Sequence, residues 1–116
     1  MNCNIENFDN LELFNTKLLE FIDFLYSIIP NRNLIKLKGK IKLTLLYDKT
    51  TIIDLFITHI EAYKNDILNE NENILLKVQQ NILNNNINLC DIYNNIDNIN
   101  KITIWKYLKV FILLIE

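Results

Sequence analysis

The chain has 116 residues, of which 50% are hydrophobic and 22% are charged, and its formal net charge at pH 7 is -2. It contains 21 Ile, 20 Asn and 19 Leu residues but only one each of Gly, Pro, Ala and Arg. This composition excludes collagen, proline-rich linkers and disordered chains of low hydrophobicity. A chain of this length forms one domain, so we expect a single domain over residues 1–116.

The first predicted element is a helix over residues 9–29. Asp9 stands three residues before Glu12, as in a capping box, and apolar residues follow at alternating spacings of three and four. Pro30 ends this helix, because the residue before a proline is disfavoured in the helical conformation. Residues 1–8 are then a candidate flexible N-terminal tail.

The next segment, residues 34–47, fits two patterns. Apolar residues alternate with lysines, which is typical of a strand, but Leu34, Leu37, Ile41 and Leu45 also share one face of a helix. No partner strand with a turn signal follows, and a lone strand leaves its backbone groups unpaired. We therefore predict a helix here.

Four more helices complete the predicted fold. Thr51 and Asp54 resemble a second capping box, and Asp97 or Asn98 can cap the last helix. The expected ranges are 51–68, 73–83, 89–96 and 98–115. The last of these is apolar on most sides, so we expect it to lie centrally. The sequence thus predicts an all-α fold, a single compact bundle of five or six helices.

The sequence contains no catalytic, cofactor or metal motif. His59 is the only histidine, and it falls outside the apolar stripe of its predicted helix, as a surface residue does. Cys3 and Cys90 are too few and too distant for a disulfide framework or a zinc site, so we expect free thiols in a reducing compartment. A single glycine excludes glycine-rich phosphate loops. We predict no enzyme activity, no cofactor and no metal.

Two pairs of carboxylates are candidate acid–base groups, Glu20 with Asp23 and Glu70 with Glu72. Neither pair lies among the apolar residues that would raise a carboxyl pKa. We interpret both pairs as solvated charge.

Positive charge is concentrated in one segment. Residues 24–47 contain no acid and five basic residues, namely Arg32, Lys36, Lys38, Lys40 and Lys42. Such a patch can contact a phosphate backbone or an anionic membrane. Because the chain has one arginine and is acidic as a whole, a solvated helix face is the favoured interpretation, and nucleic acid is an unfavoured partner.

Several apolar residues lie off the main stripes of their predicted helices. They are Leu13, Phe24, Leu43, Ile57 and Leu113. A bundle this small has limited interior space, so the surplus indicates self-association or a groove for a partner protein.

The end of the chain resembles a known group of proteins. The block Ile104, Trp105, Lys106, Tyr107 and Leu108, followed by an apolar turn and Glu116, is similar to the C-terminus of small uncharacterised proteins of nucleocytoplasmic large DNA viruses. The density of apolar residues around this block also predicts that it belongs to the core. The resemblance implies a setting in the host cytoplasm, a viral factory or the virion. The bias toward amino acids with AT-rich codons agrees with that setting.

These observations favour a non-enzymatic viral helical protein that acts by protein–protein interaction, as a homo-oligomeric structural or virion component or as an adaptor. One alternative is an antagonist that captures an amphipathic host helix, as inhibitors of apoptosis or innate immunity do. A weaker alternative is a nucleic-acid or membrane-surface accessory that uses Arg32–Lys42. The sequence shows no secretory signal and no transmembrane segment, so we expect a soluble intracellular protein.

Overall fold

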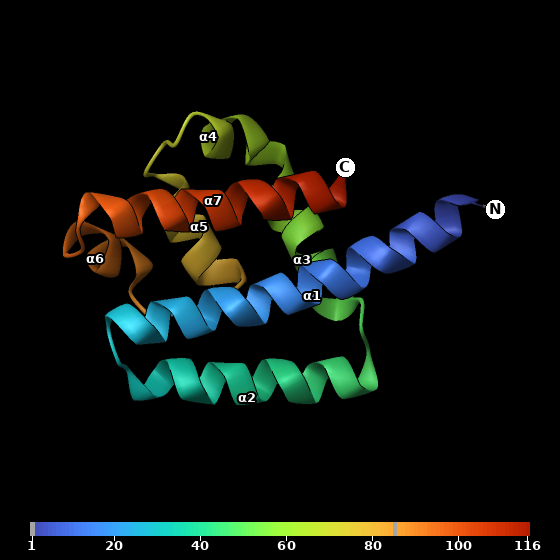
Figure 1. Ribbon diagram of the computed structural model, residues 1–116, viewed down its shortest axis with the longest axis horizontal. Coiled ribbons are helices and arrows are strands. Elements are labelled where there is room, and N and C mark those ends of the chain that lie inside the picture. Colours follow the sequence, from blue (N-terminus) through green and yellow to red (C-terminus); the bar gives the residue numbers. More distant parts are fainter. Residues whose placement is uncertain (1, 85) are drawn as a thin grey trace.

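The computed structural model describes the backbone of residues 2–84 and 86–116 and the side chains of residues 10–84 and 86–116. Within these ranges every regular element is a helix, and turns and loops connect the helices (Figure 1). The helices are α1 (Asn2–Ile28), α2 (Arg32–Tyr47), α3 (Thr51–His59), the 3-10 helix η1 (Glu61–Tyr63), α4 (Lys64–Leu68), α5 (Ile74–Asn81), α6 (Leu89–Asn94) and α7 (Asn98–Ile115). The all-α prediction is confirmed, but the expected five or six helices become seven α-helices in the described ranges.

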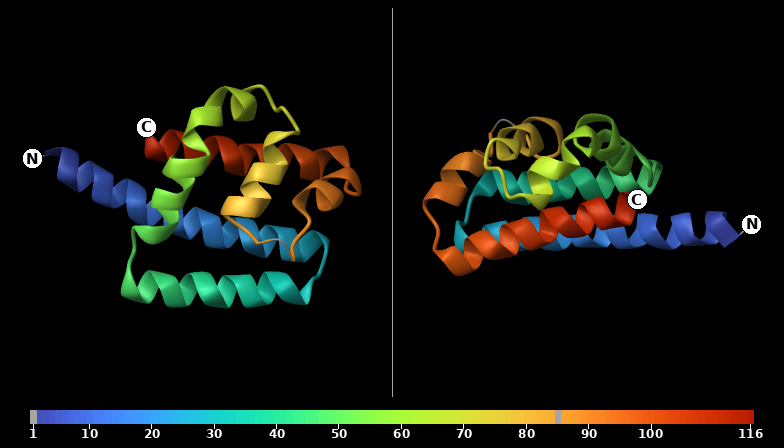
Figure 2. Two further views of the ribbon diagram at one scale, coloured as in Figure 1. Left: turned by 180° about the vertical axis from the view of Figure 1, so that it is seen from behind. Right: turned by 90° about the horizontal axis from the view of Figure 1, so that it is seen from above.

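The two longest helices, α1 and α7, contact each other and form one layer. They run in opposite directions side by side, and α2 packs along the edge of α1 (Figure 1). Helices α3, α4 and α5 cover one face of this layer (Figure 2). No other described helix lies on the opposite face, which leaves one side of α1 and α7 open.

The core is centred on aromatic side chains from three helices. The ring of Phe111 in α7 lies 5.1 Å from Phe14 of α1, 5.7 Å from Phe56 of α3 and 5.9 Å from Phe21 of α1, measured between centroids. Phe14 and Phe56 contact each other edge to face at 5.4 Å. All four rings are buried, so this cluster joins the α1–α7 layer to the helices that cover it.

Residues 34–47 are helical, as predicted. The side chain of Asn31 caps α2 by accepting a hydrogen bond from the backbone N–H of Asn33 at 2.8 Å. Leu34, Leu37 and Ile41 are the buried residues of α2. Their spacing of three and four places them on one face against α1, which is why helical periodicity prevails over the alternation with lysines.

The predicted helix over residues 51–68 is wrong, because the chain breaks it into α3, η1 and α4. The last α-helical hydrogen bond of α3 runs from the backbone N–H of Ile60 to the carbonyl of Phe56. The N–H of Tyr63 then donates to the carbonyl of Ile60, only three residues back, which makes a tighter 3-10 turn. A continuous helix would place Tyr63 on the same stripe as Phe56 and Ile60. The break leaves Tyr63 exposed and still buries Ile67 in α4 beside α7.

The predicted starts of two helices also need correction. Helix α1 begins at Asn2, so Asp9 is an interior residue, and the helix includes most of the segment considered as a tail. Apolar residues continue upstream at Phe8 and Ile5, and no proline or glycine interrupts them. Met1 lies outside the described residues.

Thr51 is likewise a helical residue rather than a cap. Thr50 precedes it, and the carboxylate of Asp48 accepts hydrogen bonds from the backbone N–H and hydroxyl of Thr50. These bonds hold the pKa of Asp48 below its usual value. Asp97, in contrast, caps α7 as predicted, by accepting from Asn100 N–H at 2.9 Å.

Two buried polar side chains fix loops to the helices. Asn15 of α1 donates to the carbonyl of Lys49 at 3.0 Å, which holds the turn between α2 and α3. Gln79 of α5 accepts from the backbone N–H of Leu89 at 2.9 Å, which holds the start of α6. Sequence periodicity did not indicate either contact.

Truncation of the central ring provides a test of this core. We expect Phe111→Ala to lower the free energy of unfolding by about 3–5 kcal/mol, because it opens a cavity shared by three helices. Leu46→Ala is the matched control: Leu46 is 82% exposed, so its truncation should change stability by less than about 0.5 kcal/mol. Urea titration followed by circular dichroism measures both. Equal losses in the two variants would contradict the assigned core.

The only glycine, Gly39, lies in the middle of α2 without structural need. Its φ is not positive, and nothing lies within 4 Å of the position that a Cβ atom would take. Gly39→Ala should therefore raise the free energy of unfolding by about 0.5–1 kcal/mol through higher helix propensity and a less flexible unfolded chain. An increase in the thermal midpoint checks this, and a decrease would show that the glycine is needed.

Candidate interaction surfaces

The residues considered for catalysis do not come together. His59 is exposed on the last turn of α3, and Cys90 is half-buried on α6. Helix α6 packs near the start of α7, whereas α3 crosses its other end (Figure 1). Cys90 lines a small cavity of about 190 Å³ with Glu72 and Tyr93, and His59 does not contribute to it.

Most of the four carboxylates that are candidate acid–base groups in the sequence form ion pairs. The salt bridges have N–O distances of 2.7–3.3 Å and join Glu20 to Lys17, Asp23 to Lys38 and Glu70 to Lys109. Glu72 is exposed in the loop before α5. These groups lie at the surface. Asp23–Lys38 joins α1 to α2 and Glu70–Lys109 joins a loop to α7, so these two are tertiary ion pairs, whereas Lys17–Glu20 lies within α1.

Two negative findings apply to the described residues. They include no group of three or more His, Cys, Asp or Glu side chains that could hold a metal ion. None of their helices has the length and apolar character that crossing a membrane requires.

The C-terminal block is divided between core and surface. Ile104, Trp105 and Leu108 are buried, whereas Lys106 is exposed and Tyr107 is partly exposed. The indole N–H of Trp105 donates to the hydroxyl of Tyr93 at 3.0 Å, and the two rings meet edge to face. Trp105 thus joins α7 to α6 within the core.

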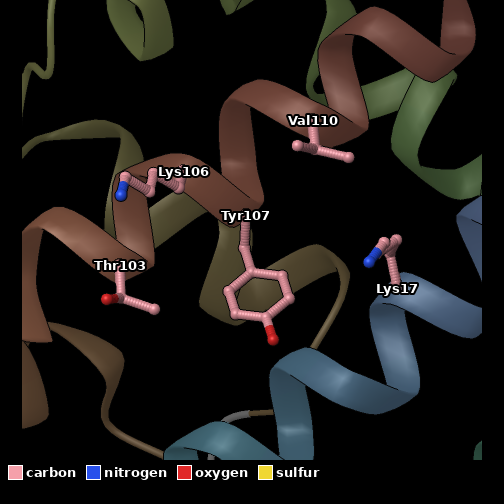
Figure 3. A pocket seen from close by; sticks show the side chains of 5 residues that line it. All are labelled: Lys17, Thr103, Lys106, Tyr107 and Val110. Atoms are coloured by element: carbon pink, nitrogen blue, oxygen red, sulfur yellow. The ribbon is translucent and has the colours of Figure 1, made fainter.

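A groove runs between α1 and α7 on the open side of their layer. Its volume is about 330 Å³, and its lining residues are Lys17, Thr103, Lys106, Tyr107 and Val110. Figure 3 shows Tyr107 reaching from α7 toward α1 and the ammonium group of Lys17 pointing into the groove from the other wall. The groove is open and shallow and has both apolar and positively charged walls.

Tyr107 forms the floor of this groove. Its ring packs against Phe21 and Phe24 of α1 at centroid distances of 5.2 and 5.9 Å. Partial burial raises the pKa of Tyr107, and the nearby carboxylate of Glu20 raises it further. The phenol therefore stays neutral and acts as a packing and hydrogen-bonding group.

Exposed apolar side chains extend on either side of the groove. Ile99, Ile102 and Leu113 of α7 are 75%, 53% and 67% exposed, and Leu13 of α1 is 43% exposed. Spacings in α7 place its three residues on the side turned away from the core, together with Lys106. We call this surface, formed by Leu13, Lys17, Glu20, Ile99, Ile102, Lys106, Val110 and Leu113, the α1/α7 face.

A second exposed surface lies on α2, away from α1. Its apolar members are Ile35, Leu43, Leu46 and Tyr47, and its basic members are Arg32, Lys36, Lys40 and Lys42, all exposed. We call this the α2 face. Lys38, the fifth basic residue considered in the sequence, instead turns toward α1, where it pairs with Asp23 at 2.7 Å.

The apolar residues that lie off the main stripes of their predicted helices account for only part of these two surfaces. Leu13, Leu43, Ile57 and Leu113 are exposed, whereas Phe24 is partly buried against Tyr107. The sequence reasoning missed Ile99, Ile102, Leu46 and Tyr47. A signal existed, because Ile99 and Leu46 lie about opposite the buried stripe of their helices, and Ile102 and Tyr47 lie well to one side of it.

Comparisons with known proteins found no match among protein-family models, curated proteins or solved structures.

The Trp105–Tyr93 hydrogen bond leads to a test of the core role of the C-terminal block. Tyr93→Phe leaves the buried indole N–H without its acceptor, so we expect a loss of about 1–3 kcal/mol in unfolding free energy. Adding Trp105→Phe removes the orphaned donor, and the double variant should lose less than the sum of the two single variants. Additive losses in a double-mutant cycle would show that the bond contributes nothing.

Proposed function

We propose that this protein acts by protein–protein interaction and that it associates with itself through the α1/α7 face. The observation that carries the proposal is the exposure of Ile99, Ile102 and Leu113 on the uncovered side of α7. A two-layer domain normally buries such a stripe against another element. A second α1–α7 layer placed against the first would bury it and fill the groove, producing a bundle of four long helices.

The charges of the two helices support a second copy as the partner. On the α1/α7 face, α1 contributes the carboxylate of Glu20, which lies beside Lys17 of the same helix. Helix α7 contributes Lys106, which forms no ion pair with a described side chain. In a two-fold dimer, a contact from α1 to α7 is repeated from α7 to α1. Placing α1 of one copy on α7 of the other therefore pairs opposite charges twice.

The proposed setting follows the resemblance of the Ile104–Leu108 block to small proteins of large DNA viruses. A small self-associating helical domain suits a structural or virion component, or an adaptor, in the infected cytoplasm or viral factory. Capture of an amphipathic host helix is the alternative use of the same surface. The groove of about 330 Å³ is small for a helix, which favours the flat pairing of two layers.

Mass measurements across protein concentration test self-association. We expect the mass, from sedimentation equilibrium between about 1 µM and about 1 mM, to rise from monomer to dimer. Leu113→Glu should raise the dimer dissociation constant at least about 30-fold, because it places a charge in the apolar contact. Leu46→Glu, an equally drastic change on the α2 face, should leave the constant unchanged.

A charge exchange tests the pairing of α1 with α7. Lys106→Glu should weaken the dimer, and Glu20→Lys added to it should restore the affinity, because the charge pairs re-form with reversed sign. A monomer at all concentrations would overturn the proposal. In that case, stoichiometric binding of a host helix that Leu113→Glu abolishes would support the alternative.

A further inference from the structure

The α2 face has a composition unlike that of the α1/α7 face. Leu46 and Tyr47 are the most exposed large apolar residues of the described chain, at 82% and 85%, and Ile35 and Leu43 exceed 50%. At a rotation of 100° per residue, Ile35, Leu43 and Leu46 form an apolar strip. Lys42 lies on one side of this strip, and Lys36 and Lys40 lie on the other side, with Tyr47 between them. This face thus presents an apolar strip with positive charge on both sides.

The positive charge is not neutralised within the described part of the molecule. Arg32, Lys36, Lys40 and Lys42 form no ion pair with any described side chain, in contrast to Lys38, which Asp23 neutralises. Asp48, directly after α2, is the first acid that follows these residues in the chain, and it lies outside the α2 face. Its carboxylate accepts hydrogen bonds from Thr50. The α2 face therefore carries a local charge of +4 in a chain whose net charge is -2.

We infer that the α2 face docks on an anionic lipid surface, with the axis of α2 parallel to the membrane. The apolar strip would enter the boundary between headgroups and acyl chains, while the lysines reach outward to lipid phosphates and carboxylates. Tyr47 has the amphipathic character of a residue at the membrane interface. The position of α2 at the edge of the fold leaves the whole length of this face accessible (Figure 1).

Charge complementarity selects an anionic occupant, and the apolar strip distinguishes lipid from nucleic acid. A phosphate backbone would satisfy Lys36, Lys40 and Lys42 but would leave Leu46 and Tyr47 in water or against charged groups. A lipid surface satisfies both sets at once. The absence of a spanning helix among the described residues is compatible with such a peripheral contact.

Vesicle flotation with the full chain tests the inference. We expect binding to phosphatidylcholine vesicles containing about 30% phosphatidylserine and little binding to phosphatidylcholine alone. The variant Lys36→Gln/Lys40→Gln/Lys42→Gln should lower the partition coefficient about 100-fold, since each lysine near the surface contributes about fivefold. Removing three lysines that lie on neither face, in Lys64→Gln/Lys77→Gln/Lys101→Gln, is the matched control and should leave most of the binding.

The apolar strip is tested separately. Leu46→Ser/Tyr47→Ser should lower the partition coefficient about tenfold with no loss of stability, because both side chains are solvent-exposed. The control Ile99→Ser/Leu113→Ser removes two exposed apolar side chains from the α1/α7 face. It should retain vesicle binding even where it weakens dimerisation, so the two proposals can fail independently.

Depth of insertion gives a direct readout. In Tyr47→Trp, the emission of the new indole should shift to the blue on anionic vesicles and be quenched by lipids labelled in the acyl chain. Tyr63→Trp, placed on η1 on the other side of α7 from α2, should show neither change. No binding to anionic vesicles at low salt would overturn the inference. So would binding to duplex DNA that needs the three lysines but survives Leu46→Ser/Tyr47→Ser, which would assign the face to nucleic acid.

Discussion

The packing of Phe111 against Phe14, Phe21 and Phe56 is the constraint on which the rest of the structure depends. These rings come from the first, third and last helices, so the cluster can form only when α7 returns along α1 and α3 crosses both. The shorter helices fill the remaining space around it. Because aromatic rings supply the largest buried apolar areas, this arrangement closes a core without a disulfide or metal among the described residues.

The same arrangement explains why two faces stay open. Helices α3 to α5 all lie on one side of the α1–α7 layer, since the short connections after α2 keep the chain there (Figure 2). The other side of the layer has no covering helix in the described chain, and α2 has a neighbour only on its inner side. The exposed apolar residues of α7 and α2 are therefore consequences of topology, and they include the most exposed large apolar side chains of the described chain.

The sequence predicted those features that depend on local patterns. The apolar period of α2, the Asp97 cap of α7 and the end of α1 at Pro30 are all determined by residues within one or two turns. The break at Ile60 was missed because Phe56, Ile60 and Ile67 fit the stripe of an unbroken helix and no glycine or proline marks the turn between them. The break accompanies the packing of α4 against α7, a contact between residues far apart in the sequence. The open faces were only partly predicted, because the exposure of a side chain depends on which other helix packs over it. The apolar stripe of a single helix does not contain that information.

The extreme scarcity of glycine has a structural consequence beyond excluding phosphate loops. The one described non-glycine residue with positive φ is Glu70, at 56°, where α4 turns into the loop and Asn71 N–H bonds back to Asp66. Glycine commonly fills this position after a helix, because a side chain is strained there. At this position Glu70 forms a 2.7 Å ion pair with Lys109, which connects the loop to α7. The only glycine is instead on the exposed side of α2, at a position that needs no conformational freedom.

The lysines of the chain also fall into two groups. Lys38 and Lys109 form ion pairs with acids on neighbouring elements, whereas Lys36, Lys40 and Lys42 neutralise none of the described acids. Ion pairing within the fold, rather than the number of lysines in the sequence, is therefore the basis on which we propose the α2 face as the lipid contact.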